Sequence, residues 1–508
     1  MKRKYYILTL LVILTSASLR AQHINTMYFL ENAPLRHTIN PAFQPVSKVY
    51  IALPVIGGTN LTIGNNGISM QDLIFKNPDG QTVTALHPSA EGLLWDKMPN
   101  LWKFDTDINL NFIGVGRRIK ENGYLTLNAA AHVIAGIGLP KSLLSPLLGQ
   151  SIENLNLKTL NASVNIYSDV AIGYSHKIND QWSVGGKLKL LMGMAHMSGQ
   201  FDEFAFNSNT NTATLRGTGN LRQAGILDMR LFMGGFEEDM DTDDDFYTDE
   251  STPMDENAEN EALMNQIMSY IKPQGYGGAI DLGFTYKPVK QLQLAVSVTD
   301  LGLMHWHTGS IGAVSVDTTF TGIADFNYSD YVVDGQFQSE LLKTDIQANL
   351  EKYGNAIHVD DIVDKAFNQM LTANLNVGVD ANFWKNRLGI GVYSHTRFFN
   401  LLDNFYATEE ITFGAAFRPA NWFNLALSYS FMNGNWSNAG AAVSLAPYDG
   451  LMLTVAADYV PLTFADYPIN ESQIIPLPYK TSMVNLSFGL AIVVGTNPKK
   501  KHKLQEEQ

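Results

Sequence analysis

Residues 422–431 of this chain read Trp-Phe-Asn-Leu-Ala-Leu-Ser-Tyr-Ser-Phe, so large apolar side chains alternate with small or polar ones. Successive side chains of a β-strand point to opposite faces, and this stretch therefore has one apolar and one polar face. The same alternation recurs in residues 292–299 and 375–383, and short turns rich in Pro, Asn and Asp join many such stretches into pairs. The pattern predicts an all-β chain of antiparallel strands.

The first 21 residues have the form of a secretory signal peptide. Lys2, Arg3 and Lys4 precede an apolar run, and small residues follow up to Ala21, after which we expect cleavage. The run is shorter than the roughly 20 apolar residues of a membrane-spanning helix, and no later segment reaches that length without interruption. The sequence thus predicts an exported protein.

The composition favours a strand-rich membrane protein over a soluble one. Only 17% of the residues are charged, against about 25% in typical soluble domains. Much of the formal net charge of −14 comes from residues 237–261, which hold many Asp and Glu and no Lys or Arg. Without clustered basic residues nothing predicts nucleic-acid binding, and the chain has no cysteine for disulfides or thiol chemistry.

Alternating strands behind an export signal predict a transmembrane antiparallel β-barrel of the outer membrane. Short joints such as Tyr286-Lys287-Pro288 are expected on the periplasmic side, with Trp182, Trp384 and Trp422 in an aromatic girdle there. About 14 strands can be threaded this way, an even number, as single-chain bacterial barrels require. Two further segments, Thr212–Phe232 and Thr318–Val333, would raise the count to about 16. A secreted β-sandwich or propeller is the soluble alternative.

The expected organisation has four parts. They are a signal peptide (1–21), an N-terminal segment (22–45), a barrel (46–496) with long outer loops at 57–104, 135–162, 195–275, 305–370 and 461–481, and a periplasmic tail (497–508).

Several short motifs resemble those of the FadL-like and PorV-like outer-membrane barrels of Gram-negative bacteria. They are Asn40-Pro41-Ala42, the aromatic-basic-Pro turns, Ile280-Asp281-Leu282-Gly283, Val298-Thr299-Asp300-Leu301-Gly302 and Ala457-Asp458-Tyr459-Val460-Pro461. The chain looks most like an uncharacterised exported family of this type. The resemblance implies that the N-terminal segment folds into the lumen as a hatch containing Asn40, Pro41 and Ala42; a plain turn before the first strand is the alternative.

Apolar residues crowd the first two predicted outer loops. Candidates for a ligand entrance are Phe75, Leu94, Trp95 and Trp102 in the first loop, and Leu143 and Leu147 in the second. Dense exposed apolar patches usually bind something. The other interpretation is that these loops pack on one another as a dry lid.

The acidic segment offers a candidate calcium site. Asp239, Asp241, Asp243, Asp245 and Glu250 follow the 1, 3, 5, 7, 12 spacing of a calcium-binding loop, but Asp244 stands where that loop needs Gly. A solvated acidic loop is the alternative. The segment His305-Trp306-His307 puts two imidazoles on one strand face, with no further metal ligand identifiable.

No motif for catalysis or phosphate binding is present, so we expect no enzyme. The leading hypothesis is an outer-membrane barrel, in contact with outer-membrane lipid, that binds or passes a hydrophobic or amphipathic small molecule. The alternative, which the PorV-like members suggest, is a factor of type IX secretion or surface assembly that binds a secreted or surface protein through its outer loops.

Overall fold

The computed structural model of the chain describes residues 25–66, 68–76, 82–84, 93–144, 160–209, 212–225, 272–321, 332–333, 336–337, 341, 344, 357–401, 404–420, 422–432, 435–448, 450–460, 464–470, 473–478 and 482–495. The predicted signal peptide, the acidic segment and the C-terminal tail lie outside these ranges.

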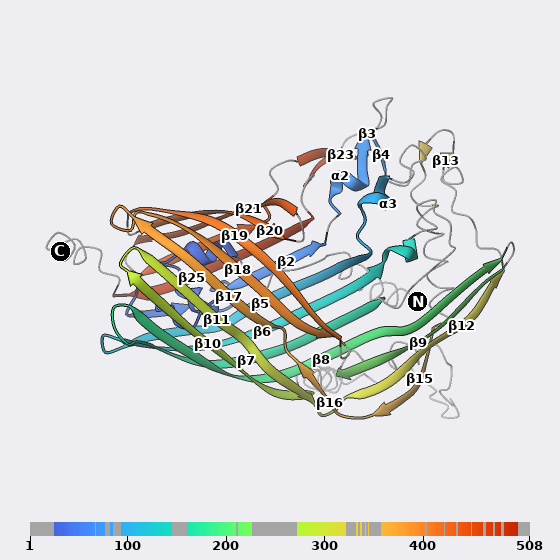
Figure 1. Ribbon diagram of the computed structural model, residues 1–508, viewed down its shortest axis with the longest axis horizontal. Coiled ribbons are helices and arrows are strands. Elements are labelled where there is room, and N and C mark those ends of the chain that lie inside the picture. The colour runs from blue at the N-terminus through green and yellow to red at the C-terminus, as the bar shows by residue number, and fades with distance from the viewer. Residues whose placement is uncertain are drawn as a thin grey trace, which may run out of the picture.

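One antiparallel sheet curls into a closed barrel (Figure 1). Its strands are β1 (Val49–Ala52), β2 (Thr59–Asn65), β5 (Leu101–Ile119), β6 (Gly123–Pro140), β7 (Asn161–Lys177), β8 (Trp182–Asn209), β9 (Thr212–Gly225), β10 (Gly275–Val289), β11 (Leu292–Trp306), β12 (Ser310–Thr321), β15 (Ile357–Asp364), β16 (Phe367–Met370), β17 (Ala373–Phe383), β18 (Leu388–Leu401), β19 (Asn404–Ala420), β20 (Phe423–Met432), β21 (Asn435–Tyr448), β22 (Leu451–Asp458) and β25 (Met483–Val494). The ring closes where β1 and β2 pair with β25 on one side and β5 on the other.

Smaller elements lie inside the ring or at its outer end. Three strand pairs are β3 (Ile74–Lys76) with β4 (Thr82–Thr84), β13 (Val332–Val333) with β14 (Gln336–Phe337), and β23 (Phe464–Asn470) with β24 (Gln473–Pro478). The helical turns are η1 (Asn25–Phe29), η2 (Pro34–Thr38), α2 (Met70–Leu73), α3 (Leu93–Lys97) and η4 (Lys141–Leu144). Within the described part of the chain, no helix has the length and apolar character needed to cross a membrane.

The described strands make a barrel of sixteen, two more than the fourteen predicted. The two additional strands are β9 and β12. β9 lies in the segment Thr212–Phe232, which the sequence marked as a possible extra strand, whereas β12 overlaps the other marked segment, Thr318–Val333, only at residues 318–321. β9 pairs with the outer half of β8 while β10 pairs with its inner half, so β9 stands end to end with β10. In the same way β12 stands above β11. The extra strands therefore lengthen this side of the wall toward the outside, as Figure 1 shows.

The predicted outer loops 57–104, 195–275 and 305–370 are wrong in part, because they contain wall strands. β2 was missed because the first strand is interrupted between Ala52 and Thr59, which breaks the alternation. β9 was marked only as a possible extra strand, and left within the predicted loop 195–275, because its exposed face carries Arg216 and Asn220 in place of apolar residues. A strand that extends beyond the lipid does not need an apolar face. The alternation of apolar and polar residues, which predicts the other strands, is therefore absent from β9.

The two faces of the wall are as the alternation predicts. On β8 and β20 the outward side chains are apolar and exposed, for example Leu188 at 64% and Leu427 at 54%, whereas Asn424 and Ala426 are buried inside. Trp182, Trp384 and Trp422 are exposed at the end with the short turns, where the aromatic girdle is predicted. The apolar outer face of β11 runs from Leu292 to Leu303, which at about 3.4 Å per residue and a tilt of about 40° covers roughly 28 Å of bilayer.

Candidate functional site

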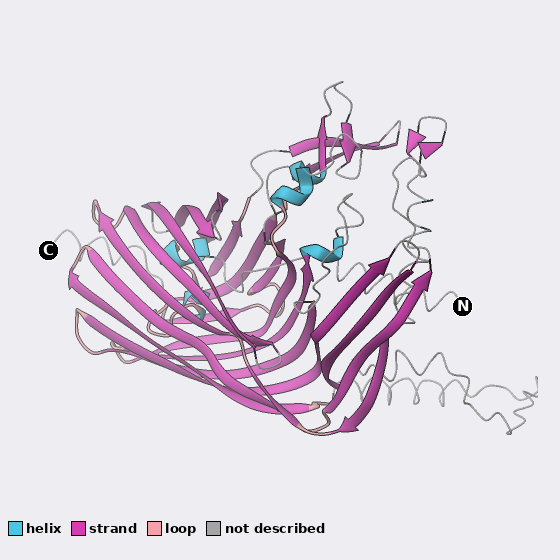
Figure 2. Ribbon diagram, turned by 45° about the vertical axis from the view of Figure 1, so that its right-hand side comes forward, coloured by secondary structure: helices cyan, strands magenta, loops and turns pink. Residues whose placement is uncertain are grey.

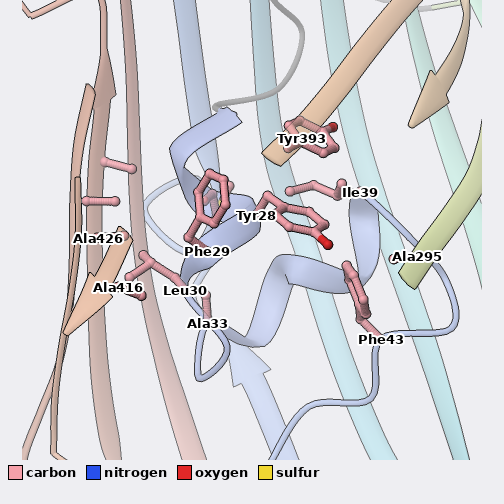
Figure 3. Packing of buried hydrophobic residues seen from close by; sticks show 13 residues of the cluster. Tyr28, Phe29, Leu30, Ala33, Ile39, Phe43, Ala295, Tyr393, Ala416 and Ala426 are labelled. Carbon is pink, nitrogen blue, oxygen red and sulfur yellow. The ribbon is translucent and has the colours of Figure 1, made fainter. Parts of the chain in front are cut away.

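The N-terminal residues 25–45, which we call the plug, lie inside the ring of strands (Figure 2). Apolar side chains of the plug pack against small residues of the wall, as Figure 3 shows for Phe29, Ala416 and Ala426. The ring of Tyr28 stacks on that of Tyr393 with centroids 4.6 Å apart. The plug therefore has its own apolar interface with the wall, and forms much of the core of the lumen.

Wall glycines make room for the plug. A Cβ atom on Gly378 would come within 2.7 Å of the Tyr28 ring, and one on Gly283 within 2.9 Å of the Pro41 ring. A Cβ on Gly185 would lie 2.6 Å from the Ala42 nitrogen and closer still to the Pro41 carbonyl group. Such distances are far below van der Waals contact, so these positions admit the plug only as glycine.

Polar groups of the wall hold both ends of η1. The Asp458 carboxylate accepts hydrogen bonds from the backbone nitrogen of Asn25, at 2.6 Å, and from the backbone and hydroxyl of Thr26. The Tyr28 hydroxyl donates to Asp380 Oδ1 at 2.7 Å. The Arg418 guanidinium donates to the Phe29 carbonyl oxygen at 3.3 Å. Arg418 belongs to one of the aromatic-basic-Pro turns, which thus contribute to the lumen as well as to chain reversal.

The predicted hatch residues Asn40, Pro41 and Ala42 lie against β8, β10 and β11. The Asn40 side-chain amide donates to the carbonyl oxygens of Phe284 and Val296, at 3.3 and 3.1 Å, and its own oxygen accepts from the Ala42 nitrogen at 2.9 Å. Just before them, the Ile39 carbonyl accepts from Ser297 and Asn376 of the wall, at 2.7 and 3.2 Å.

Asp281 of the Ile280–Gly283 motif and Asp300 of the Val298–Gly302 motif meet in an ion cluster on the lumen side. Asp300 has a left-handed backbone, with φ of 60°, at a bulge where β11 shifts register against β10. Asp281 Oδ1 accepts from the Asp300 nitrogen at 2.8 Å. Lys189 Nζ lies 3.0 Å from Asp281 and 2.5 Å from Asp300. The bulge therefore brings the buried carboxylate of Asp281 and the partly buried carboxylate of Asp300 to one lysine, which compensates their desolvation.

A cavity of about 90 Å³ lies between the plug and this cluster. The plug contributes Met27, Leu35 and Thr38, and the wall contributes mainly polar side chains, among them Asn109, His132, Asp169, Lys187, Lys189 and Asp300. A water needs about 10–15 Å³ of such space, so the cavity has room for several waters or one small polar group.

Lys187 is the distinctive group of this cavity. Its side chain is 6% exposed. Among the described residues, its ammonium has neither a hydrogen-bond nor an ion-pair partner. Lys189, two residues further along the same face of β8, is paired with two carboxylates. The sequence carried a signal for both, since Lys187 and Lys189 alternate with the lipid-facing Leu188 and Leu190. A charge at every second position of a strand indicates a polar lumen.

His37 is a buried residue of the plug that lies near Lys187 and contacts Tyr50 of the wall. Its Nε2 lies 2.5 Å from the Tyr50 hydroxyl. Burial, and then the positive charge of Lys187, lower the pKa of His37 well below its ordinary value. The docked plug therefore contains a neutral imidazole.

The predicted ligand-entrance residues do not line this cavity. Leu94 is buried with Ile68 and Met98, and Trp95 and Trp102 pack against them in a small outer cluster. Lys141 Nζ lies 4.3 Å from the Trp95 ring centre. The described part of the first loop thus packs on itself. Phe75 and Leu143 belong to β3 and η4, but their side chains, and all of Leu147, lie outside the described residues.

The candidate calcium ligands Asp239, Asp241, Asp243, Asp245 and Glu250 also lie outside the described residues. Within the described ranges, no group of three or more His, Asp or Glu side chains could hold a metal ion. His305 and His307 both point away from the lumen, on either side of the buried Trp306.

A family model described as a family of unknown function, DUF5723, matches residues 41–458. No curated protein matches the sequence. Solved structures similar to the chain include the Ralstonia pickettii toluene transporter TbuX (9% identity, TM-score 0.39, 88% of this chain and 90% of that one) and the P. putida toluene transporter TodX (11%, 0.38, 91% and 94%). A Pseudomonas aeruginosa FadL homologue is a third (9%, 0.36, 92% and 94%). Likenesses this weak say nothing of what the chain binds.

Proposed function

This chain belongs to DUF5723, a family of unknown function, and we propose that it is an outer-membrane barrel that passes an amphipathic small molecule bearing an anionic group, gated by its N-terminal plug. The outward apolar band and the aromatic residues at the short-turn end support placement in a membrane. The predicted signal peptide supports the outer membrane as its location. We infer no catalysis.

The observation that carries the proposal is the unpartnered Lys187 in the cavity beneath the plug. A buried lysine without a counter-ion is costly, and an anion bound beside it removes much of that cost. The nearby carboxylates of Asp281 and Asp300 are already bonded to Lys189. Lys187 therefore has no ion-pair partner among the described residues, while the more distant carboxylates of Asp281, Asp300 and Asp169 act on its charge.

The cavity also explains why the plug must move. About 90 Å³ accommodates a head group but not an alkyl chain with it. Met27 and Leu35, which form the plug's side of the cavity, would make way for the apolar part of a solute. The docked plug is then the closed state, and passage requires the plug to break its hydrogen bonds to the acceptors Asp458 and Asp380 and the one that it accepts from Arg418.

Uptake into proteoliposomes tests this proposal. Hexanesulfonate and hexyltrimethylammonium have the same alkyl chain and opposite charge, and neither crosses a bilayer readily. We expect the wild-type barrel to admit the sulfonate roughly tenfold faster, as about 1.4 kcal/mol of charge preference would give. Lys187→Met should abolish the preference.

Lys177→Met is the matched control, because Lys177 lies at a short turn outside the lumen, paired with Asp180. It should keep the preference of the wild type. Equal uptake of the two solutes by the wild type would overturn the anion preference, and no uptake of either by a folded barrel would overturn passage itself.

One observation favours the second candidate, a surface-assembly factor. β8, β9, β12 and β15 carry the wall beyond the apolar band on one side. This raised wall would offer a protein partner a rigid surface. Co-purification of a secreted protein that depends on β9 and β12, with no solute uptake, would support this candidate over the first.

A further inference from the structure

The outward face of β11 changes character abruptly at its outer end. Leu301 and Leu303 are 46% and 53% exposed on the lipid-facing side. The next two residues on that face are His305 and His307, both exposed, while Trp306 between them is buried toward the lumen. A change from leucine to histidine on one face marks the boundary between lipid tails and head groups.

The neighbouring strands place an aromatic and an amide beside these histidines. His305 lies opposite Tyr276 of β10 and Asn368 of β16, and its Nδ1 is 2.8 Å from Asn368 Oδ1. The His307 ring stacks on Tyr276 with centroids 5.6 Å apart and planes 12° apart. With strands about 4.8 Å apart, the row is roughly 10 Å wide.

The backbone places two exposed lysines near the row. Gly309 follows His307 by two residues, and its carbonyl oxygen accepts a hydrogen bond from the Lys365 backbone nitrogen at 2.9 Å. The His307 nitrogen donates to the Gln274 carbonyl at 3.1 Å, two residues from Lys272. The carboxylate next to Lys365 in sequence, Asp364, already accepts a hydrogen bond from Ser310 at 3.0 Å.

We propose that this patch, formed by Lys272, Tyr276, His305, His307, Lys365 and Asn368, binds the phosphate group of a lipid head group in the outer leaflet. Lysines supply charge, the His307 imidazole and the Asn368 side-chain amide supply directed hydrogen bonds, and tyrosine packs at the level of the head group. Basic clusters at that depth bind phosphorylated head groups. The inference rests on the proposed membrane placement and does not require that the barrel pass any solute.

Titration of the detergent-solubilised full-length barrel with lipid A, followed by native mass spectrometry, tests the site. The triple variant His305→Ala, His307→Ala, Lys365→Ala should bind lipid A roughly tenfold more weakly than the wild type. Lys177→Ala, at the opposite end of the barrel, should bind as the wild type does. A heat-dependent shift in gel mobility establishes that each variant is folded.

Dephosphorylated lipid A and inorganic phosphate separate the possible sources of the anion. Weak binding of the dephosphorylated lipid to the wild type is expected. Equal binding of both lipids, or an unchanged affinity in the triple variant, would overturn the proposal. Inorganic phosphate that displaces nothing agrees with a lipid site, whereas phosphate that binds as tightly as lipid A would overturn the assignment to a lipid.

Discussion

Gly185 provides the most specific test of how the plug is seated. In Gly185→Ala the new methyl group would lie 2.6 Å from the Ala42 nitrogen, against plug backbone that cannot rotate away. Asn40, Pro41 and Ala42 must therefore lift from β8. The adjacent Gly186→Ala is a matched control, because its nearest neighbours would be the Asp281 carbonyl oxygen at 3.5 Å and the Leu282 side chain at 3.6 Å, which is ordinary contact.

The size of the effect follows from the hydrogen bonds that this part of the plug makes. Asn40 donates to two wall carbonyls, and the Ile39 carbonyl accepts from Ser297 and Asn376. At about 1 kcal/mol for each buried hydrogen bond, loss of three or four of them shifts docking by about 3–4 kcal/mol. The undocked fraction should rise by roughly 10²- to 10³-fold.

Cysteine labelling measures this fraction directly, because the chain has no cysteine of its own. Ala33 is a buried plug residue, 2% exposed, so a maleimide should react with Ala33→Cys only when the plug leaves the lumen. We expect labelling about 100-fold faster in the Gly185→Ala background and unchanged labelling in the Gly186→Ala background. Equal rates in the two backgrounds, with both barrels heat-modifiable, would refute this account of the glycine.

Three further outcomes are expected. Leu427→Arg, on the lipid face, should reduce the yield of heat-modifiable barrel because a midplane arginine there costs roughly 2–4 kcal/mol, whereas Asn109→Arg in the polar lumen should assemble; equal yields would contradict the assignment of the faces. Since the pKa of His37 is lowered in the docked plug, stability is full above the unfolded value of about 6.5 and is lost as pH falls below it. Labelling of Ala33→Cys should thus accelerate in acid, with a smaller pH dependence in His37→Gln. Asp458→Ala removes the acceptor of the Asn25 and Thr26 nitrogens, and should raise the susceptibility of the plug to protease; digestion at the wild-type rate would show that η1 is held by packing alone.

The period of two was sufficient to predict which way the strands face. In residues 422–431 every assignment to the lipid or lumen side rests on alternation, a local property that the chain carries within each strand. The plug was expected from Asn40-Pro41-Ala42 by resemblance, and the structure adds its contacts. The Asn25 nitrogen and its acceptor Asp458 are 433 positions apart, so no local pattern could pair them.

The cavity was missed for a related reason. Lys187 and Lys189 are ordinary basic residues in sequence, and their difference arises because Asp281 of β10 and Asp300 at the bulge of β11 both bond to Lys189. Trp95 and Trp102, by contrast, attracted attention as apolar loop residues although they pack into their own outer cluster. Composition identifies candidates for binding, but the folded neighbours decide which side chain is left without a partner.

A reversible lock on the plug tests the central claim most directly. Thr26 Oγ1 lies 2.5 Å from Ser428 Oγ, so Thr26→Cys combined with Ser428→Cys should form a disulfide between the plug and the wall. Hexanesulfonate uptake by proteoliposomes of this variant is then measured before and after reduction. The account predicts that the oxidised barrel admits almost no solute and that reduction restores uptake. Equal uptake in the two states, with the disulfide verified by mass spectrometry, would contradict a gate formed by the plug.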